Sequence, residues 1–317
     1  MPHETIRALK CFAGGQAYCL DIDQVLAIER SSRMRPNPAP AGPNGWIVRW
    51  GKRIPVYGLA ERLGADARTE NAEAIVVIDR ANPWGMAVQR VARFERHLSR
   101  PQPVPAALSH QSGGCLSGVV IEDGCLIPCL SPERLHPDAP PLPPAQLEPP
   151  AAALRHDGPA GWKGPGRLLL FSPRNPVRSP GQETFLFGVS YTQILEIVSG
   201  IPHIELPAAP RHVLGMIAWR ERPVAVVDAG ALFGLDPLAL RAGGRLLIAR
   251  APRWQAPVAI PIGDDFHTRA LPLPHRPCRR TLSLDLTHAR GVFEIDGNHV
   301  LVVPDVDAIV RPSAESR

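Results

Sequence analysis

Long apolar runs are missing from this chain of 317 residues. No stretch approaches the ~20 apolar residues that a membrane-spanning helix needs, because Asp228 and Asp236 interrupt the best candidate. The first residues, Met1 to Arg7, also lack the basic and then apolar pattern of a secretory signal. These two absences predict a soluble cytoplasmic protein.

Cysteine, lysine and aromatic residues are scarce. Six cysteines are too few for a disulfide framework in a chain this long and fit reduced, partly buried thiols. Lysine occurs only at Lys10, Lys52 and Lys163, so the net charge of +5 comes almost entirely from arginine. Aromatic residues make up 5% of the chain, and no basic run is long enough to form an electrostatic footprint for nucleic acid by itself.

The chain also lacks the common catalytic and ligand-binding motifs. It has no Gly-x-Ser-x-Gly elbow, no phosphate-binding loop and no Gly-x-Gly-x-x-Gly after a strand. The histidines are scattered, and the adjacent carboxylates Asp264 and Asp265 are more typical of a solvated turn than of a catalytic pair. Cys125 and Cys129 form only one close pair, whereas a zinc site usually has two on turns, so we expect the cysteines to be small core residues. No enzyme activity, cofactor or metal is predicted.

Three sequence blocks occur twice in the same order. Tyr18–Ile28 matches Phe187–Ile197, with a shared Gln-aliphatic-aliphatic-x-Ile ending. Gly45–Gly64 matches Gly215–Gly234 at a displacement of 170 (215−45 and 234−64). The third pair, Gly118–Leu130 and Gly291–Val303, is displaced by 173 (291−118). Chance similarity would not keep both order and register, so the blocks indicate a duplicated domain.

Proline separates the two copies. The stretch from His136 to Leu154 is rich in Pro-Pro pairs, which remove backbone donors and fix φ, so it predicts a semi-rigid spacer. A ligand for a proline-recognition domain is the alternative reading of the same stretch. We therefore predict domain 1 over residues 1–136, a linker over 137–165 and a divergent domain 2 over 166–312.

Within each copy the pattern predicts a mainly β fold. Short alternating segments are separated by Gly, Pro and Asp-Gly. Asp123-Gly124 and Asp296-Gly297 predict tight hairpin turns, and Pro132–Leu135, with Ser131 as the N-cap, predicts a short helix. Many short strands with regular turns indicate closed or partly closed antiparallel barrels. Further segments assigned to strands are Ala17–Ile22, Ile54–Tyr57, Ala74–Ile78 and Gly85–Val88, and further short helices are expected at Leu59–Leu63 and Asp305–Val310.

The three blocks resemble the CheW-like domain, the adaptor module of bacterial chemotaxis arrays. The resemblance covers nearly all of both copies and leaves out the linker. It implies two tandem CheW-like domains, each made of two small five-stranded SH3/OB-like barrels with short helices around a shared core. It also implies a non-catalytic scaffold that binds the regulatory domain of the chemotaxis histidine kinase, the cytoplasmic tip of methyl-accepting receptors, or other CheW-like adaptors. Such a protein stays in the cytoplasm or is recruited to receptor arrays at the membrane without inserting into it.

The two copies depart from the family pattern at different positions. The family's Glu in the first block falls on Ala27 in domain 1 and on Glu196 in domain 2, and its Arg falls on Trp50 and Arg220. Domain 2 therefore keeps an acid and a base, whereas domain 1 has a methyl group and an indole. A surface ion pair contributes at most ~1 kcal/mol to stability, so the change is expected to alter partner choice. The residues predicted to bind partners are Glu196, Arg220, Asp228, Trp50, Arg49 and Ala27.

Two hypotheses follow for the duplication. The domains divide the work, one holding a kinase-like partner and the other a receptor or second adaptor, or one copy is a degenerate packing partner. A basic small-barrel protein that binds single-stranded nucleic acid is the alternative function, because Trp46 to Trp50 and Trp219-Arg220 place indoles beside arginines.

Overall fold

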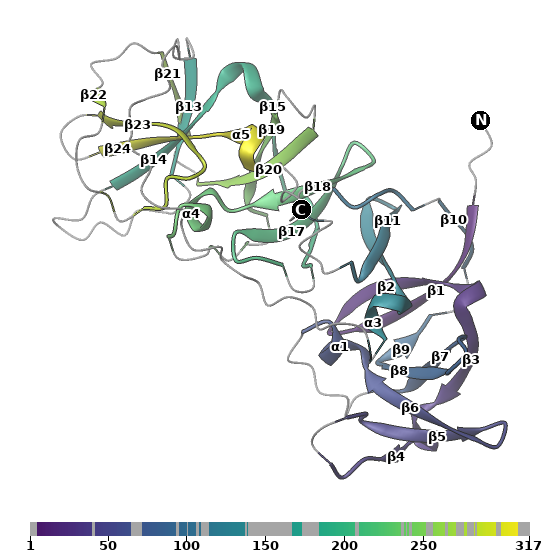
Figure 1. Cartoon of the computed structure of the whole chain (residues 1–317). Coiled ribbons are helices and arrows are strands. Elements are labelled where there is room, and N and C mark those ends of the chain that lie inside the picture. The colour runs from purple at the N-terminus through teal and green to yellow at the C-terminus, as the bar shows by residue number, and fades with distance from the viewer. Residues whose placement is uncertain are drawn as a thin grey trace.

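The computed structural model contains two β-rich domains in tandem (Figure 1). No described helix is long and apolar enough to cross a membrane. The Asp296-Gly297 turn, the Asp264-Asp265 pair and the linker beyond residue 138 lie outside the described residues. The structure describes residues 5–39, 42–64, 72–92, 95–99, 101–105, 108, 114–136, 138, 167–172, 184–206, 209–235, 238, 240, 243–251, 256–263, 266–270, 276–277, 282, 284–295 and 299–309.

Domain 1 consists of short strands and a few single-turn helices, as predicted. Its described elements are β1 (Thr5–Ala13), β2 (Gln16–Asp21), η1 (Ile22–Gln24), β3 (Val25–Arg30), η2 (Ser31–Arg33), β4 (Arg35–Pro36), β5 (Gly45–Arg49), β6 (Lys52–Gly58), α1 (Leu59–Arg62), β7 (Ala74–Ile78), β8 (Trp84–Val88), β9 (Arg90–Val91), β10 (Glu95–Ser99), β11 (Leu116–Glu122), β12 (Cys125–Leu130) and α3 (Pro132–Leu135).

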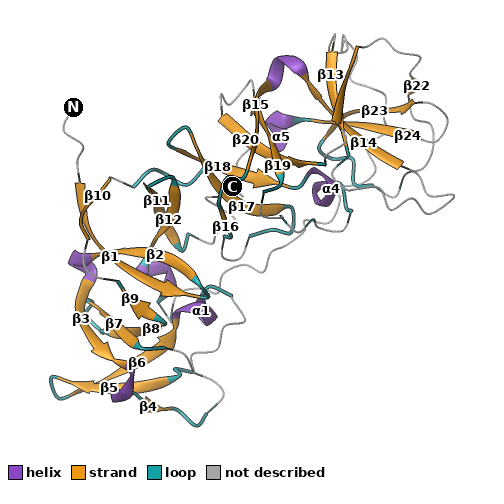
Figure 2. Cartoon of the chain, turned by 180° about the vertical axis from the view of Figure 1, so that it is seen from behind, coloured by secondary structure: helices purple, strands orange, loops and turns teal. Residues whose placement is uncertain are grey.

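Domain 2 repeats this order of elements. They are β13 (Arg167–Phe171), β14 (Thr184–Ser190), η4 (Tyr191–Gln193), β15 (Ile194–Ser199), β16 (His203–Ile204), β17 (Val213–Trp219), β18 (Arg222–Val227), α4 (Ala229–Leu232), β19 (Arg245–Ala251), β20 (Ala256–Ile262), β21 (Phe266–Ala270), β22 (Arg276–Pro277), β23 (Ala289–Ile295), β24 (His299–Pro304) and α5 (Val306–Ile309). Strands dominate both halves (Figure 2).

Sheet topology confirms the duplication. In domain 1 one sheet has the order β3-β7-β8-β6-β5-β4, and in domain 2 its counterpart has the order β15-β19-β20-β18-β17-β16. The other two sheets run β10-β1-β2-β12-β11 and β21-β13-β14-β24-β23-β22. Parallel pairs also recur, because β6 pairs with β8 as β18 pairs with β20. Each described sheet counts six strands rather than the expected five, since each includes a two-residue strand.

The turn and helix predictions hold with one difference. Asp123 and Gly124 have φ values of 48° and 75°, as a two-residue hairpin turn of type I′ requires. The helix α3 has Ser131 at the N-cap position and Pro132 in its first turn, but the Ser131 side chain makes no capping hydrogen bond. Pro132 has no N–H to satisfy, so its fixed φ supplies the helix start instead.

Each domain packs two barrels around a shared core. In β7, Ile75 and Val77 belong to the small core of one barrel, whereas Val76 and Ile78 point into the large core. Both faces of this strand are buried, which explains its continuous run of β-branched residues. The shared core expected from the family resemblance is therefore present.

The two domains also contact each other. Strands β11 and β12 of domain 1 lie against β16, β17 and β18 of domain 2 (Figure 2). The side-chain amide of Gln102 donates a hydrogen bond to the carbonyl of Glu221 at 2.7 Å, and that of Gln16 donates to the carbonyl of Glu205 at 3.3 Å. The same large core continues from domain 1 into domain 2.

Candidate functional site

Three of the six predicted binding residues, Arg49, Trp50 and Arg220, lie on one hairpin in each domain. The strands β5 and β6 are joined by Trp50 and Gly51, with Arg49 opposite Lys52. Their counterparts β17 and β18 are joined by Arg220 and Glu221. Both turns have two residues with positive φ, 48° and 70° in the first and 50° and 59° in the second. A bulky residue with a left-handed backbone conformation destabilises the fold by roughly 1–2 kcal/mol. Trp50 therefore occupies this turn although its backbone conformation is strained.

An ion pair closes the barrel of domain 1. Strand β3 lies at one end of its sheet, yet Glu29 on β3 forms an ion pair with Arg49 at the tip of β5. Arg33 also reaches Glu29, with 2.8 Å between its Nη1 atom and Oε2. The Glu29 carboxylate is nearly buried and is therefore held by two guanidinium groups. We call this group, Ala27, Glu29, Arg33, Arg49 and Trp50, seam 1.

Domain 2 closes its barrel with different atoms. Glu196 on β15 accepts hydrogen bonds from the indole N–H of Trp219 at 3.0 Å and from Arg220 at 3.1 Å, both on Oε2. The guanidinium carbon of Arg220 also lies 4.6 Å from the centre of the Trp219 ring. We call this group, Glu196, Trp219 and Arg220, seam 2. Its charged groups are more exposed than the Glu29 carboxylate of seam 1. Of the Arg220 side chain 67% is accessible, and of the Glu196 side chain 41%.

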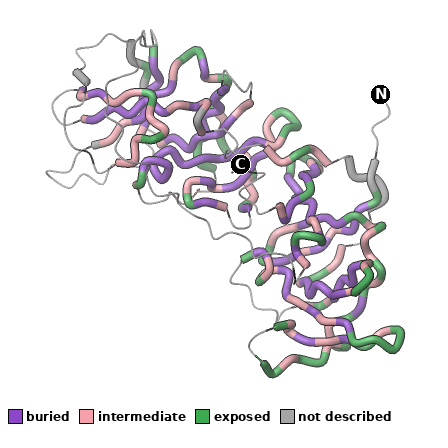
Figure 3. Tube along the Cα trace, in the orientation of Figure 1, coloured by how far each residue is buried: buried purple, intermediate pink, exposed green. Residues whose placement is uncertain are grey.

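Exposed apolar side chains flank both seams. Leu26 and Ile28 lie on the outer face of β3, and Leu195 and Ile197 lie at the equivalent positions of β15. Scattered surface leucines need no explanation, but the same exposed pair beside the same seam in both domains marks a candidate contact surface. The tip of the β5–β6 hairpin is exposed as well (Figure 3).

The structure places the six predicted residues unevenly. Trp50 is 56% exposed, and Arg49, Glu196 and Arg220 take part in the seams. Ala27 packs against the small barrel core of domain 1. The carboxylate of Asp228 is buried and accepts hydrogen bonds from the N–H groups of Gly230, Ala231 and Leu238. We therefore assign Asp228 a structural part as the N-cap of α4 and leave it out of the proposed binding surface.

Sequence reasoning missed the acid of domain 1. The pattern position is Ala27, but Glu29 lies two residues further along β3, and residues two apart share a face of a strand. The base is also displaced by one residue, because Arg49 and Trp50 stand where domain 2 has Trp219 and Arg220. An acid–base–indole group is thus present in both domains. The i, i+2 periodicity was the signal that could have identified Glu29.

Four of the five cysteines of domain 1 are buried thiols, whereas Cys125, which was expected in the core, is exposed because it directly follows the Asp123-Gly124 turn at the start of β12. Burial raises the pKa of Cys11 and Cys115 to about 12, so both are protonated at neutral pH. Cys19 and Cys129 are direct partners on the parallel strands β2 and β12, and the hydrogen bond between their thiols, together with burial, raises the pKa of Cys19. Among the described residues no group of three or more metal-ligating side chains is present. This arrangement fits small core side chains.

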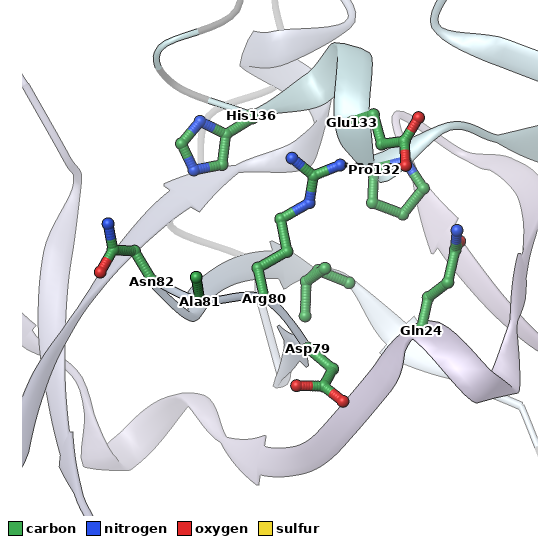
Figure 4. A pocket seen from close by; sticks show the side chains of 9 residues that line it. Gln24, Asp79, Arg80, Ala81, Asn82, Pro132, Glu133 and His136 are labelled. Atoms are coloured by element: carbon green, nitrogen blue, oxygen red, sulfur yellow. Dashed lines mark ion pairs between the residues drawn. The ribbon is translucent and has the colours of Figure 1, made fainter.

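A pocket of about 480 Å³ lies on domain 1 away from the seam. It is open and polar, and the Nη2 atom of Arg80 lies 3.3 Å from Oε1 of Glu133 across it (Figure 4). Substrate sites are usually enclosed and mainly apolar, so the pocket gives no support to a catalytic reading. It is lined by Gln24, Ile78, Asp79, Arg80, Ala81, Asn82, Pro132, Glu133 and His136.

The comparison with family models agrees with the fold. The family model described as the CheW-like domain matches residues 7–139 and 177–313. Among solved structures, the scaffolding protein TtCheW from Thermoanaerobacter tengcongensis is similar at 17% identity and a TM-score of 0.35, over 46% of this chain and 92% of that chain. A search of curated proteins finds no match.

The two matched segments fall on the two structural domains and leave out the proline-rich stretch between them. Together they cover well over half of the chain. The first segment contains nearly all of domain 1, and the second begins after β13 and contains the rest of domain 2. Each segment includes the seam between β3 and β5 or between β15 and β17. The chain therefore belongs to the CheW-like family and carries two CheW-like domains in tandem.

Proposed function

We propose that the protein is a non-catalytic adaptor that couples methyl-accepting receptors to a chemotaxis-type histidine kinase. The observation that supports this most is the pair of equivalent but chemically different seams. Each seam combines charged groups, an indole and a flanking apolar pair. Trp and Arg are the residues most enriched in the centres of protein–protein interfaces.

We further propose that the two domains divide the work. Seam 1 presents an exposed indole and buries its acid, whereas seam 2 exposes its acid and base. A partner that matches one seam would leave charged groups buried or unpaired if it bound the other seam, and this lowers its affinity for the wrong domain. One domain then holds the kinase regulatory domain and the other holds the receptor tip or a second CheW-like adaptor. The protein would act in the cytoplasm at receptor arrays.

The alternative is that one domain is only a packing partner. The exposure of Trp50 argues against a degenerate domain 1, because an indole with no contact role would gain stability by burial. The strained turn supports the same conclusion, since backbone strain of this kind concentrates at functional positions.

Two matched variants of the full chain test the proposal. Trp50→Gly and Arg220→Gly each replace a residue with φ near +50° by glycine, which adopts that conformation without strain. We expect neither variant to lose thermal stability. In titration calorimetry with a purified kinase regulatory domain and with a receptor cytoplasmic fragment, we expect each variant to lose affinity for a different partner, by roughly tenfold or more.

Two outcomes would count against this proposal. If the unmodified chain binds neither the kinase domain nor the receptor fragment, the adaptor function is wrong. If both variants weaken the same partner equally, the domains do not divide the work.

A further inference from the structure

The hairpin of domain 1 carries an unusual concentration of positive charge. Residues 30–53 contain six Lys or Arg residues and no Asp or Glu. The equivalent residues 200–223 of domain 2 contain three arginines and two glutamates. The excess is therefore a local feature of one copy and is not explained by the overall composition. The six cations are Arg30, Arg33, Arg35, Arg49, Lys52 and Arg53.

Strand register places two of these cations on one surface with Trp46 and Val48. Arg35 is opposite Trp46, and Val48 is opposite Arg53, so these four side chains share the outer face of the sheet. The alternating residues Ile47 and Ile54 point into the barrel core. We call the outer surface, Arg35, Trp46, Val48, Trp50 and Arg53, the hairpin face of domain 1. Lys52 is opposite Arg49 and therefore lies on the other face of the sheet, with Ile47 and Ile54.

The hairpin face is open and its charges are largely uncompensated. Val48 and Trp50 are 65% and 56% exposed. Glu29 pairs with Arg33 and Arg49 below this face, while Arg35, Lys52 and Arg53 make no ion pair with the described part of the chain. The guanidinium carbon of Arg53 lies 5.4 Å from the centre of the Trp46 ring, and that of Arg49 lies 4.4 Å from the Trp50 ring. Stacking of this kind holds a guanidinium group in place and leaves its N–H edge available for a carboxylate.

The equivalent face of domain 2 is already covered by protein. Met216 and Ala218 stand at the positions of Trp46 and Val48, Met216 is fully buried and Ala218 packs against the same core. Strands β11 and β12 of domain 1 lie against this region, and Gln102 donates to the carbonyl of Glu221 at the hairpin tip. This position of the fold thus binds a folded protein within the same chain. In domain 1 the same position is vacant and cationic.

We propose that the hairpin face of domain 1 binds an acidic protein segment that carries apolar residues between its carboxylates. The carboxylates pair with Arg35 and Arg53, and the apolar residues cover Val48 and Trp50. A protein is favoured over a nucleic acid because one face of each indole is already occupied by an arginine, whereas single-stranded nucleic acids need open ring faces for stacking. The proposal rests on the proposed adaptor function in one respect, namely that the acidic segment belongs to a protein partner.

The test uses the full chain and three purified probes. These are a peptide of glutamate and leucine, an oligothymidylate, and vesicles of phosphatidylcholine with phosphatidylglycerol. We expect the peptide to bind best, with an affinity that falls as salt rises. Arg53→Glu should weaken peptide binding by about tenfold or more, because the change replaces an attraction by a repulsion.

A matched control separates the local effect from net charge. Arg222 on the equivalent hairpin of domain 2 is also exposed. Arg222→Glu changes the net charge by the same amount as Arg53→Glu and should change peptide affinity by less than about twofold. Equal losses for the two hairpins, or tighter binding of the oligothymidylate or the vesicles than of the peptide, would overturn the proposal. Because neither kinase nor receptor is used, failure of this test is distinct from failure of the adaptor function.

Discussion

Gly215→Ala should unfold domain 2 at a much lower temperature than the unmodified chain. Gly215 has φ of +140°, and a Cβ atom there would overlap the carbonyl oxygen of Ile204 on the neighbouring strand β16 and lie 2.9 Å from its carbonyl carbon. That carbonyl cannot retreat without disturbing the pairing of Ile204 with Met216. Strain at φ and overlap together should cost roughly 3–5 kcal/mol. For a domain of this size the midpoint should fall by about 10 °C or more.

The repeat provides matched comparisons for this prediction. At Gly45, the equivalent residue, an added Cβ atom would lie 2.5 Å from the carbonyl oxygen of Arg35. Gly45 has no positive φ, so Gly45→Ala should destabilise domain 1 by the overlap alone, which is less than the loss for Gly215→Ala. Gly64 and Gly234 follow the short helices with φ of 75° and 86° and have space around them, so Ala there should cost only about 1 kcal/mol. Hydrogen exchange of each domain, measured by mass spectrometry, assigns the loss. An unchanged midpoint for Gly215→Ala would contradict the close approach of β16 and β17.

Asp228→Ala should produce the second large loss of stability. Its buried carboxylate accepts from three backbone N–H groups, at 2.8 Å from Gly230, 3.2 Å from Ala231 and 2.7 Å from Leu238. Removing it leaves three donors without an acceptor in a site closed to water, which should cost roughly 3 kcal/mol. The loss is measured as the free energy of unfolding in urea.

Asp228→Asn is the control for this cap. An amide oxygen can still accept from Gly230 and Ala231, but its NH2 group cannot accept from Leu238. Its stability should therefore lie between those of the unmodified chain and Asp228→Ala. If Asp228→Ala keeps full stability and loses a partner instead, the capping assignment is wrong and Asp228 is a binding residue.

The sequence was sufficient for the organisation of the molecule because duplicated blocks preserve register. Gly45 and Gly215, which are 170 residues apart, are glycine in both copies for a steric reason. At each position a side chain would collide with a carbonyl oxygen of a neighbouring short strand. Strand segments such as Ala74–Ile78 were also predictable, because a β-branched run between turn residues fits few other elements.

The details of the seams were less predictable, for physical reasons. Glu29 could replace the acid expected at position 27 because the side chains at both positions point to the same face of β3. A motif compares residue types position by position and therefore does not detect an acid that is shifted by two residues. Burial of Asp228 depends on its contact with Leu238, which lies ten residues further along the chain and is not linked to Asp228 by any periodic pattern. The contact between Gln102 and Glu221 depends on how the two domains pack and has no signal in the sequence.

The most direct test of the central claim is sedimentation of the full chain with a kinase regulatory domain and a receptor cytoplasmic fragment together. Two independent recognition surfaces predict a single complex that contains all three proteins, and excess of one partner should not displace the other. Competition between the two partners for one molecule of this chain would contradict the account, because the tandem domains would then act as one surface.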